Sequence, residues 1–407
     1  MRKSILVAGL LLLTPAISQA TTLEDLLVEK GVITKGEASA ASRGAAGSVS
    51  WNNGNRFSYP SEGVTAKVAT LLQSRYTFTD NDSDSGLENT SSFDTRRARI
   101  IVSGTALHEE FKYVLSADFT GSGGDTIRDA YFKWAACDWL ALKFGQMKTG
   151  ISRQFNTSAH NLQFVERSTV SDYMDLGRQQ GISAWSELAD GMIVVGAGAY
   201  NGESDGEGRN LSGVDTRHTG VVNLRINALG SMDSHLEGDI EGHLEGDIEG
   251  TEDAALSIGA AYAHSSSRND LGLGLEKTDR DTISVDVNFK SNGFSVHGEY
   301  FYQNQDADSF SDSIDVNGFY LQAGYFLDPK VLEIAARYAF LDCDDGKASG
   351  ACAGVDDINQ VAATINYHFK DNNLKAQLGY EFNNNDLPGS GGDINTNRWI
   401  FQLSAYM

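Results

Sequence analysis

Apolar and polar residues alternate along the segment Phe93–Phe119. In its second half, Tyr113 and Leu115 share a wholly apolar face, whereas Lys112 and Asp118 fall on the opposite, polar face. A period of two residues is that of a β-strand, because successive side chains of a strand point to opposite sides. Such two-faced strands are typical of a soluble sheet with one wet side, and equally of a membrane barrel with lipid outside and water inside.

The same alternation recurs from Thr65 to Met407 and predicts about sixteen strands, an even number as in single-chain bacterial barrels. The connections are short and long in turn. The short ones are Leu107–Glu110, Ala136–Asp138, Ala189–Gly191, Ser291–Gly293, Asp328–Lys330 and Lys370–Asn372. The long ones are Thr79–Ser92, Lys148–Gly177, Gly202–Val214, Ser266–Asp279, Asn304–Asp315, Asp342–Asp356 and Asn383–Thr396. Short periplasmic turns and long extracellular loops are typical of outer-membrane barrels. We therefore expect an all-β fold, in which residues 64–407 form a transmembrane antiparallel β-barrel of about 16 strands.

The N-terminus reads as a secretory signal peptide over residues 1–20. Arg2 and Lys3 supply the charged start, Ile5–Leu13 the apolar run, and Ser18–Ala20 a small-residue cleavage site. The apolar run is too short to cross a bilayer as a helix, and no other stretch is an uninterrupted apolar run of sufficient length. We expect export and cleavage after Ala20.

Residues 21–63 are predicted to form an N-terminal periplasmic segment ahead of the barrel. Leucines in Thr21–Ser42 favour a short helical part, and Thr34 with Glu37 resembles a capping box. Arg43–Gly63 is rich in Gly, Ser and Asn and is predicted to be a linker. The segment is interpreted either as a plug of structure at the barrel mouth or as an amphipathic oligomerisation or tethering segment.

One connection is long at a position where the alternation of short and long connections predicts a short periplasmic turn. Residues 229–253 are strongly acidic and contain the sequence HLEGDIEG twice in tandem, at His235–Gly242 and at His243–Gly250. No Lys or Arg occurs between Arg225 and Arg268. The composition predicts a solvated, disordered insertion. The alternative is an appendage that binds a divalent cation or a partner.

The composition limits the classes of partner and chemistry. A formal net charge of −23 argues against nucleic acid, which selects basic surfaces. The sequence has no HExxH, GxxxxGK[ST], GxSxG or paired CxxC motif, so we expect neither an enzyme nor a cofactor. Of the three cysteines, Cys343 and Cys352 stand close together in a Gly/Asp/Ala-rich stretch and form a candidate disulfide.

A short acidic run imitates the start of a calcium-binding loop. Asp80, Asp82 and Asp84 have the required spacing, but Ser85 occupies the position of the turn glycine and Ser91 that of the bidentate Glu. These aspartates are therefore weak metal candidates, and a charged surface loop is the preferred interpretation.

The function is expected to depend on the lumen, the space inside the barrel. The candidate pore-lining residues, which fall on the polar faces of the first strands, are Arg75, Arg97, Arg99, Lys112, Asp118, Lys133 and Lys143. Lys and Arg at the bilayer midplane cost a few kcal/mol each, so these side chains must face water. Together they provide either general solvation of the wall or a path for anions, because rows of like charge set the selectivity of a pore.

The long connection Lys148–Gly177 is the best candidate for a constriction loop. It carries charged and polar side chains that could narrow the pore if the loop folds inward. The candidate residues are Arg153, His160, Glu166 and Arg167.

Several segments carry a resemblance to a known family. They are LLVEKGVITKGEA at Leu26–Ala38, FDTRRARI at Phe93–Ile100, EFKYVLSADF at Glu110–Phe119, DAYFKW at Asp129–Trp134, LALKFGQMKTG at Leu140–Gly150 and LQFVERS at Leu162–Ser168. With these segments the chain resembles the phosphate-selective porin O and P family of Gram-negative outer membranes. The resemblance implies a sixteen-stranded barrel that associates with outer-membrane lipid and lipopolysaccharide. It also implies a homotrimer that passes small anions or other small solutes.

The outer connections depart from the basic entrance of the phosphate-selective members. Asn304–Asp315 contains four Asp and no Lys or Arg, and such a vestibule repels multivalent anions at low salt. The expected function is therefore an outer-membrane porin for passive diffusion of small hydrophilic solutes and ions, with a lean to anions. The alternatives are a phosphate- or polyphosphate-selective channel and, in another class, a non-conducting surface-binding or structural barrel.

Overall fold

The fold is described from a computed structural model of the full chain. It describes residues 30, 34, 50–52, 56–61, 64–82, 87–106, 108–120, 127–202, 214–230, 243–270, 275–307, 312–344, 347, 350–389 and 392–407. The predicted signal peptide lies outside the described residues, and so does the predicted helical part of residues 21–42 apart from Lys30 and Thr34. The chain divides into two compact units, Met1–Ser48 and Val49–Met407, and the second contains all of the described strands.

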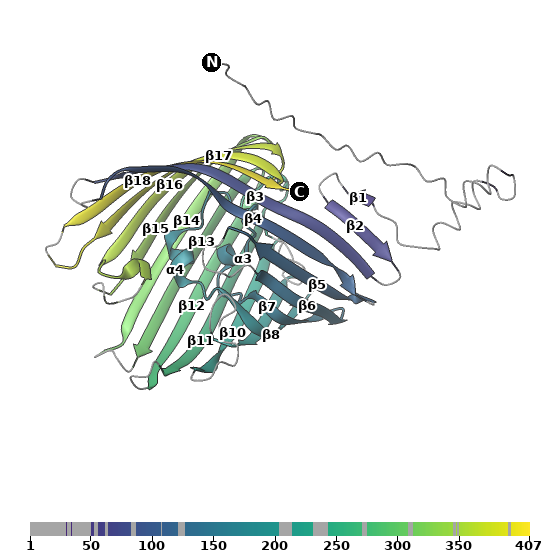
Figure 1. Ribbon diagram of the computed structural model, residues 1–407, viewed down its shortest axis with the longest axis horizontal. Helices are drawn as coiled ribbons and strands as arrows, with labels where there is room; N and C mark the ends of the chain where they lie inside the picture. The colour runs from purple at the N-terminus through teal and green to yellow at the C-terminus, as the bar shows by residue number, and fades with distance from the viewer. Residues whose placement is uncertain are drawn as a thin grey trace, which may run out of the picture. The chain divides into compact units, whose positions relative to one another are not determined.

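Sixteen described strands, β3 to β18, form a closed antiparallel barrel in which each strand pairs with the next along the chain. The first eight are β3 (Val64–Asn81), β4 (Thr90–Ala106), β5 (His108–Asp118), β6 (Ile127–Cys137), β7 (Leu140–Lys148), β8 (Arg178–Leu188), β9 (Ile193–Tyr200) and β10 (Val214–Leu229). The second eight are β11 (Ala255–Asp270), β12 (Leu275–Ser291), β13 (Phe294–Ala307), β14 (Ile314–Asp328), β15 (Leu332–Asp342), β16 (Asp357–Lys370), β17 (Leu374–Asp386) and β18 (Asp393–Tyr406). Pairing of β18 with β3 closes the ring (Figure 1), and the sixteen-stranded antiparallel barrel is thereby confirmed.

A small hairpin of β1 (Ser50–Asn52) and β2 (Arg56–Ser61) precedes the barrel. The pairing of β3 with β18 ends at Leu71, opposite Tyr406, and β2 pairs with the preceding part of β3, from Phe57 opposite Val68 onwards. An unpaired edge offers free backbone N–H and C=O groups, and β2 covers that edge. The prediction of a linker over residues 43–63 was therefore wrong for these two strands.

The barrel exposes apolar side chains and buries polar ones. On the outer face, Phe132 is 60% exposed and Leu321 52% exposed. On the inner face, Gln73 and Asn366 are fully buried and hydrogen-bonded to other inward-facing groups. Water-soluble proteins have the opposite arrangement. An apolar belt around closed strands is the arrangement that lipid requires, because every backbone group of a closed barrel is bonded within the sheet.

The connections define two ends of the barrel. The short-connection end carries the turns β6–β7, β8–β9, β12–β13, β14–β15 and β16–β17, and the long-connection end carries the segment between β7 and β8. The predicted long loop Ser266–Asp279 is mostly strand instead, since β11 reaches Asp270 and β12 begins at Leu275, and β13 extends to Ala307 into the predicted loop Asn304–Asp315. Backbone pairing continues there irrespective of side-chain polarity, so the loss of apolar alternation did not mark the strand ends. No helix in the described part of the chain is long and apolar enough to span a membrane.

Candidate functional site

The connection between β7 and β8, residues 149–177, lies inside the barrel and is here called the constriction loop (Figure 1). It contains two short helices, α3 (Arg153–Asn156) and α4 (Thr169–Met174). Each starts at a serine, Ser152 or Ser168, whose hydroxyl accepts a hydrogen bond from a backbone N–H of the first turn. Most of the loop is buried, so it folds inward as the sequence analysis anticipated for this segment.

Charged side chains of β12, β13 and β17 hold the constriction loop against one side of the wall. Arg153 Nε donates to Asp286 Oδ1 at 2.5 Å. The carboxylate of Glu299 accepts from Ser152 Oγ at 2.8 Å. Lys375 Nζ donates to the carbonyl oxygen of Leu162 at 2.6 Å. These buried, charge-assisted contacts fix the loop to the half of the barrel formed by β11–β17.

An apolar cluster inside the barrel holds α4. Its members are Val170, Met174, Phe301, Ile314, Val316, Tyr320, Ala339, Leu341, Cys343, Cys352 and Ile358. Cys343 and Cys352 are joined in a disulfide with a Cα–Cα distance of 5.2 Å, and both are fully buried. The pair that the sequence suggested thus closes the connection between β15 and β16, which includes the short 3₁₀ helix Gly350–Cys352. This connection packs against α4 through the apolar cluster.

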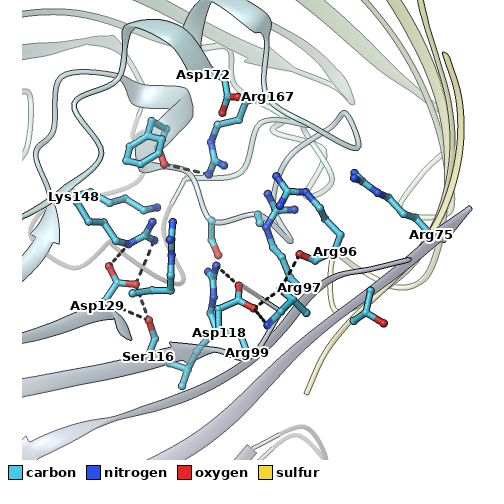
Figure 2. Close-up of a pocket in the computed structure, with 18 of the residues that line it drawn as sticks. Arg75, Arg96, Arg97, Arg99, Ser116, Asp118, Asp129, Lys148, Arg167 and Asp172 are labelled. Atoms are coloured by element: carbon cyan, nitrogen blue, oxygen red, sulfur yellow. Dashed lines mark hydrogen bonds and ion pairs between the residues drawn. The ribbon is translucent and has the colours of Figure 1, made fainter. Parts of the chain in front are cut away.

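A basic cavity of about 430 Å³ lies on the other side of the constriction loop, against β3–β8. Figure 2 shows its labelled side chains pointing into one space from several elements. Among the described residues, seven arginines and one lysine line it together with four aspartates. The basic residues are Arg75, Arg96, Arg97, Arg99, Arg128, Lys148, Arg167 and Arg178, and the acidic ones are Asp94, Asp118, Asp129 and Asp172. Positive groups therefore dominate this part of the lumen.

Glu166 of the constriction loop bridges three of these arginines. Its carboxylate lies 2.6 Å from Arg75 Nη1, 2.6 Å from Arg96 Nε and 3.3 Å from Arg97 Nη2. Burial disfavours the charged form of Glu166, but the neighbouring Arg97, Arg96 and Arg75 outweigh it and hold the pKa of this carboxyl below its ordinary value. Glu166 is accordingly ionised at neutral pH and neutralises part of the cluster.

Other lining cations are also held by acceptors. Arg99 Nη2 lies 3.0 Å from Asp118 Oδ2, and Arg178 Nε lies 2.8 Å from Asp129 Oδ1. Arg167 donates to three backbone carbonyls of the loop itself, those of Gln154, Phe155 and Thr157. These contacts fix the positions of the guanidinium groups and balance some of their charge.

Three of the lining arginines, Arg96, Arg128 and Arg178, were not among the candidates from the sequence, and two of the three occupy β-bulges. On β4, Arg97 lies opposite Gln73 but Thr95 opposite Ser74, so Arg96 is the extra residue. On β6, Asp129 lies opposite Ser116 but Ile127 opposite Ala117, so Arg128 is the extra residue. A bulge interrupts the alternation of faces and turns a side chain that strict alternation assigns to the lipid side into the lumen. A period-two pattern does not mark either position.

A second cavity of about 580 Å³ adjoins the first, since Arg75, Arg96, Arg167 and Asp172 line both. It also contacts Arg280 of β12 and Arg398 of β18, near the long-connection ends of those strands. The arginine-lined space therefore continues toward the long-connection end.

The structure separates the predicted lining residues into two groups. Arg75, Arg97, Arg99 and Asp118 line the basic cavity. Three lysines lie apart from it in a cross-strand row nearer the short-connection end, in which Lys112 is opposite Lys133 and Lys133 is opposite Lys143.

The four candidates of the constriction loop also have different surroundings. Glu166 and Arg167 line the second cavity. Arg153 is instead buried against Asp286 and is an anchor of the loop. His160 is buried and stacks on Tyr406, with ring centroids 4.0 Å apart.

The prediction of a solvated acidic insertion was wrong for the start of the second repeat copy, His243–Ile248. Residues 231–242, which include the first copy of the repeat, lie outside the described residues. In the second copy, Glu245, Asp247 and Ile248 are buried. Composition alone predicted disorder because it takes no account of the polar inner wall, whose amides hydrogen-bond this acidic segment.

The calcium-loop candidates have other partners. Asp80 accepts a hydrogen bond from Asn89 at 2.6 Å, Asp82 accepts one from Asn395 at 3.4 Å, and Asp84 lies outside the described residues. In the described part of the chain, no group of three or more His, Cys, Asp or Glu could hold a metal ion.

The comparisons with known proteins agree with this architecture. The family model described as phosphate-selective porin O and P matches residues 68–388. The outer membrane channel DcaP of Acinetobacter baumannii is similar in structure with a TM-score of 0.59 at 12% identity, over 86% of this chain and 99% of that chain. An anion-selective porin from Comamonas acidovorans has a TM-score of 0.57 at 12% identity, over 84% and 99%. The trimer form of OmpT from Vibrio cholerae has a TM-score of 0.53 at 12% identity, over 85% and 100%. No curated protein matches the chain at a significant level.

A closed barrel with an apolar exterior, a polar interior and a loop folded into its lumen is a channel of the bacterial outer membrane. The chain belongs to the phosphate-selective porin O and P family. It is a multi-pass outer-membrane porin for passive diffusion of small hydrophilic solutes and ions, and the family and the fold are those of a channel rather than of an enzyme.

Proposed function

We propose that this porin prefers small anions, and that solutes pass through the basic cavity beside the constriction loop. The observation that carries the proposal is the gathering of arginines from β3, β4, β6, β8 and the loop around one space of about 430 Å³. Fixed charges of one sign in a narrow passage attract ions of the opposite sign and repel those of the same sign. A monovalent anion is therefore favoured in this passage over a cation of the same size.

The preference is moderate and general rather than specific for phosphate. A tight phosphate site requires guanidinium groups whose N–H donors converge on the anion. Here Glu166 engages Arg75, Arg96 and Arg97, while Asp118 engages Arg99 and Asp129 engages Arg178. An incoming phosphate would have to compete with these carboxylates. Weak, charge-based attraction of many small anions fits such a compensated cluster better.

Targeting and assembly complete the proposal. Residues 1–20 direct export and are removed, residues 21–63 lie in the periplasm, and the short-connection end of the barrel faces the periplasm. The assembly is a homotrimer in contact with outer-membrane lipid and lipopolysaccharide. The trimer form of OmpT, which shares the fold, supports this assembly state.

Reversal potentials of the purified protein in planar bilayers test the selectivity. In a potassium chloride gradient, we expect a potential whose sign corresponds to chloride permeating faster than potassium, with a size that falls as salt is raised. A potential of the opposite sign would contradict an anion path.

The effect of added phosphate on the chloride current distinguishes the proposal from the alternative, a phosphate- or polyphosphate-selective channel, which the family description favours. We expect millimolar phosphate to leave the chloride current nearly unchanged. Saturable block of that current by phosphate would instead support a phosphate-binding channel.

A further inference from the structure

The second copy of the tandem repeat, His243–Gly250, enters the barrel from the short-connection end. It belongs to the connection between β10, which ends at Leu229, and β11, which begins at Ala255. Glu245 is fully buried, and its backbone N–H donates to the carbonyl oxygen of Asn161 in the constriction loop at 3.3 Å. Two connections that leave opposite ends of the barrel thus meet inside it.

Glu245 makes the principal polar contacts between the second repeat copy and the constriction loop. Its Oε2 accepts from the backbone N–H of Gln163 at 2.8 Å and from Gln322 Nε2 at 3.0 Å. Its Oε1 accepts from Gln154 Nε2 at 3.0 Å. Gln154 and Gln163 belong to the constriction loop, whereas Gln322 belongs to β14. One carboxylate therefore joins the repeat, the loop and the wall.

Asp247 fixes the same segment to the rim of the barrel. Its carboxylate accepts from the backbone N–H of Gly293 at 2.7 Å, in the turn between β12 and β13, and from Thr251 Oγ1 at 2.6 Å. The backbone N–H of Asn292 also donates to the carbonyl oxygen of Thr251 at 2.8 Å. The base of the segment is thus tied to a neighbouring turn.

Gly246 fits its position because it has no side chain. A Cβ there would lie 2.4 Å from Glu333 Oε1. Glu333 is itself fixed, because its Oε1 accepts from Gln163 Nε2 at 2.8 Å and its Oε2 accepts from Asn366 Nδ2 at 2.8 Å. A larger residue at position 246 would have to disturb these bonds or move the segment out.

Burial of a carboxylate is strongly unfavourable unless hydrogen-bond donors replace its water. The three N–H donors around Glu245 meet this requirement, and amides on both the loop and the wall provide them. A solvated linker that merely rested against the opening would not need such partners. The second copy therefore occupies a specific binding position inside the lumen, formed by residues of the loop and the wall.

We propose that the second copy of the repeat is a plug that locks the constriction loop from the short-connection end and confines solutes to the arginine-lined side of the lumen. Glu245 and Gly246 are the residues that position it. The confinement to the arginine side rests on the anion path proposed above, whereas the locking of the loop does not.

The duplication supplies matched control variants within the same chain. Glu237 and Gly238 occupy the equivalent positions of the first copy, eight residues earlier in an identical sequence. Glu245→Gln keeps the size of the side chain but replaces one acceptor oxygen by an NH₂ group, which cannot accept the hydrogen bonds that Glu245 receives. Gly246→Val adds a side chain where Glu333 leaves no room. Glu237→Gln and Gly238→Val make the same chemical changes in the other copy.

The experiment is single-channel recording of the full-length protein and the four variants in planar bilayers. We expect Glu245→Gln and Gly246→Val to raise the conductance about 1.5- to 2-fold and to increase current flicker, because a wider, less ordered lumen carries more ions. Glu237→Gln and Gly238→Val should match the wild type. Retention of the compact form in unheated gel samples shows that each barrel is folded.

Removal of both copies, residues 235–250, gives a second measurement if a point variant fails to fold. The deletion should also raise the conductance. Equal conductance of the wild type, Glu245→Gln, Gly246→Val and the deletion would overturn the plug. Equal effects of the two glutamate variants would overturn the assignment to the second copy. The reversal potential of the wild type tests the anion path separately, so failure of one proposal is distinguishable from failure of the other.

Discussion

The carboxylate of Glu245 accepts a hydrogen bond from the backbone N–H of Gln163 at 2.8 Å, although the two residues reach this point from opposite ends of the barrel. The second repeat copy and its partners on the constriction loop lie against β12–β14. Open space lined by arginines lies against β3–β8. It continues along the constriction loop toward the long-connection end, where Arg280 of β12 and Arg398 of β18 line it. The position of the loop therefore decides which charges a solute meets.

Neutralising Glu166 should strengthen the preference for anions. The carboxylate offsets part of the charge of Arg75, Arg96 and Arg97. In water, a unit charge about 5 Å from an ion is worth about 0.8 kcal/mol, or about a fourfold change in local concentration. We expect Glu166→Gln to raise the anion-to-cation permeability ratio about two- to fourfold at low salt. The exposed turn variant Asp190→Asn is the control, and an unchanged ratio in Glu166→Gln would contradict the placement of Glu166 beside the path.

The arginines at the two bulges should contribute to selectivity although alternation assigns them to the lipid side. Removing the charges of Arg96 and Arg128 takes two positive groups away from the basic cavity. We expect Arg96→Gln and Arg128→Gln together to lower the anion-to-cation permeability ratio, measured by reversal potential. Lys112→Gln, outside that cavity, should have a smaller effect. If Lys112→Gln were the stronger variant, the selective region would lie nearer the short-connection end.

Asp286 should be required for a stable constriction loop. It lies 2.5 Å from Arg153, and both groups are buried. Removing one partner of a buried pair leaves an uncompensated charge and typically costs about 3–5 kcal/mol. We expect Asp286→Asn to lower the free energy of unfolding by about that amount, measured by urea titration of the compact gel form. Adding Arg153→Met should recover part of the loss, and Asp328→Asn in an exposed turn is the control. Additive losses in the double variant would show that the two residues do not act as a pair.

The disulfide should restrain α4, because Cys343 and Cys352 belong to the apolar cluster that contains Val170 and Met174. A crosslink that closes a loop of about ten residues restrains the unfolded chain by about 2–3 kcal/mol. We expect Cys343→Ala with Cys352→Ala to unfold at lower denaturant and to show more current flicker than the wild type. Cys137→Ala changes the exposed free cysteine and should do neither. Flicker equal to that of the wild type would mean that apolar packing alone holds α4.

The sequence was sufficient for the barrel because lipid and water impose a two-residue period on every strand. The same rule located Arg75, Arg97, Arg99 and Asp118 on the lumen side. It failed at Arg96 and Arg128, because a bulge inserts one residue and reverses the side that parity assigns.

Other features depend on contacts between distant segments. The seat of Glu245 is formed by Gln154, Gln163 and Gln322, which are far from it in sequence. Nothing in the composition of residues 229–253 identifies these partners. In the same way, β2 pairs with the part of β3 beyond the β18 pairing, an arrangement that involves segments far apart in the sequence.

The most direct test of the account is the accessibility of single cysteines on the two sides of the lumen. In a Cys137→Ser background, Thr120→Cys lies in the lining of the basic cavity, where Thr120 Oγ1 is bonded to Asp118. Ser295→Cys lies on the side filled by the second repeat copy, where Ser295 is buried and bonded to Gln163. The measurement is the current before and after addition of a negatively charged methanethiosulfonate reagent. We predict that the current through Thr120→Cys falls while that through Ser295→Cys stays constant, and that a positively charged reagent reacts more slowly at position 120. A loss of current through Ser295→Cys, with no loss through Thr120→Cys, would contradict an arginine-side path.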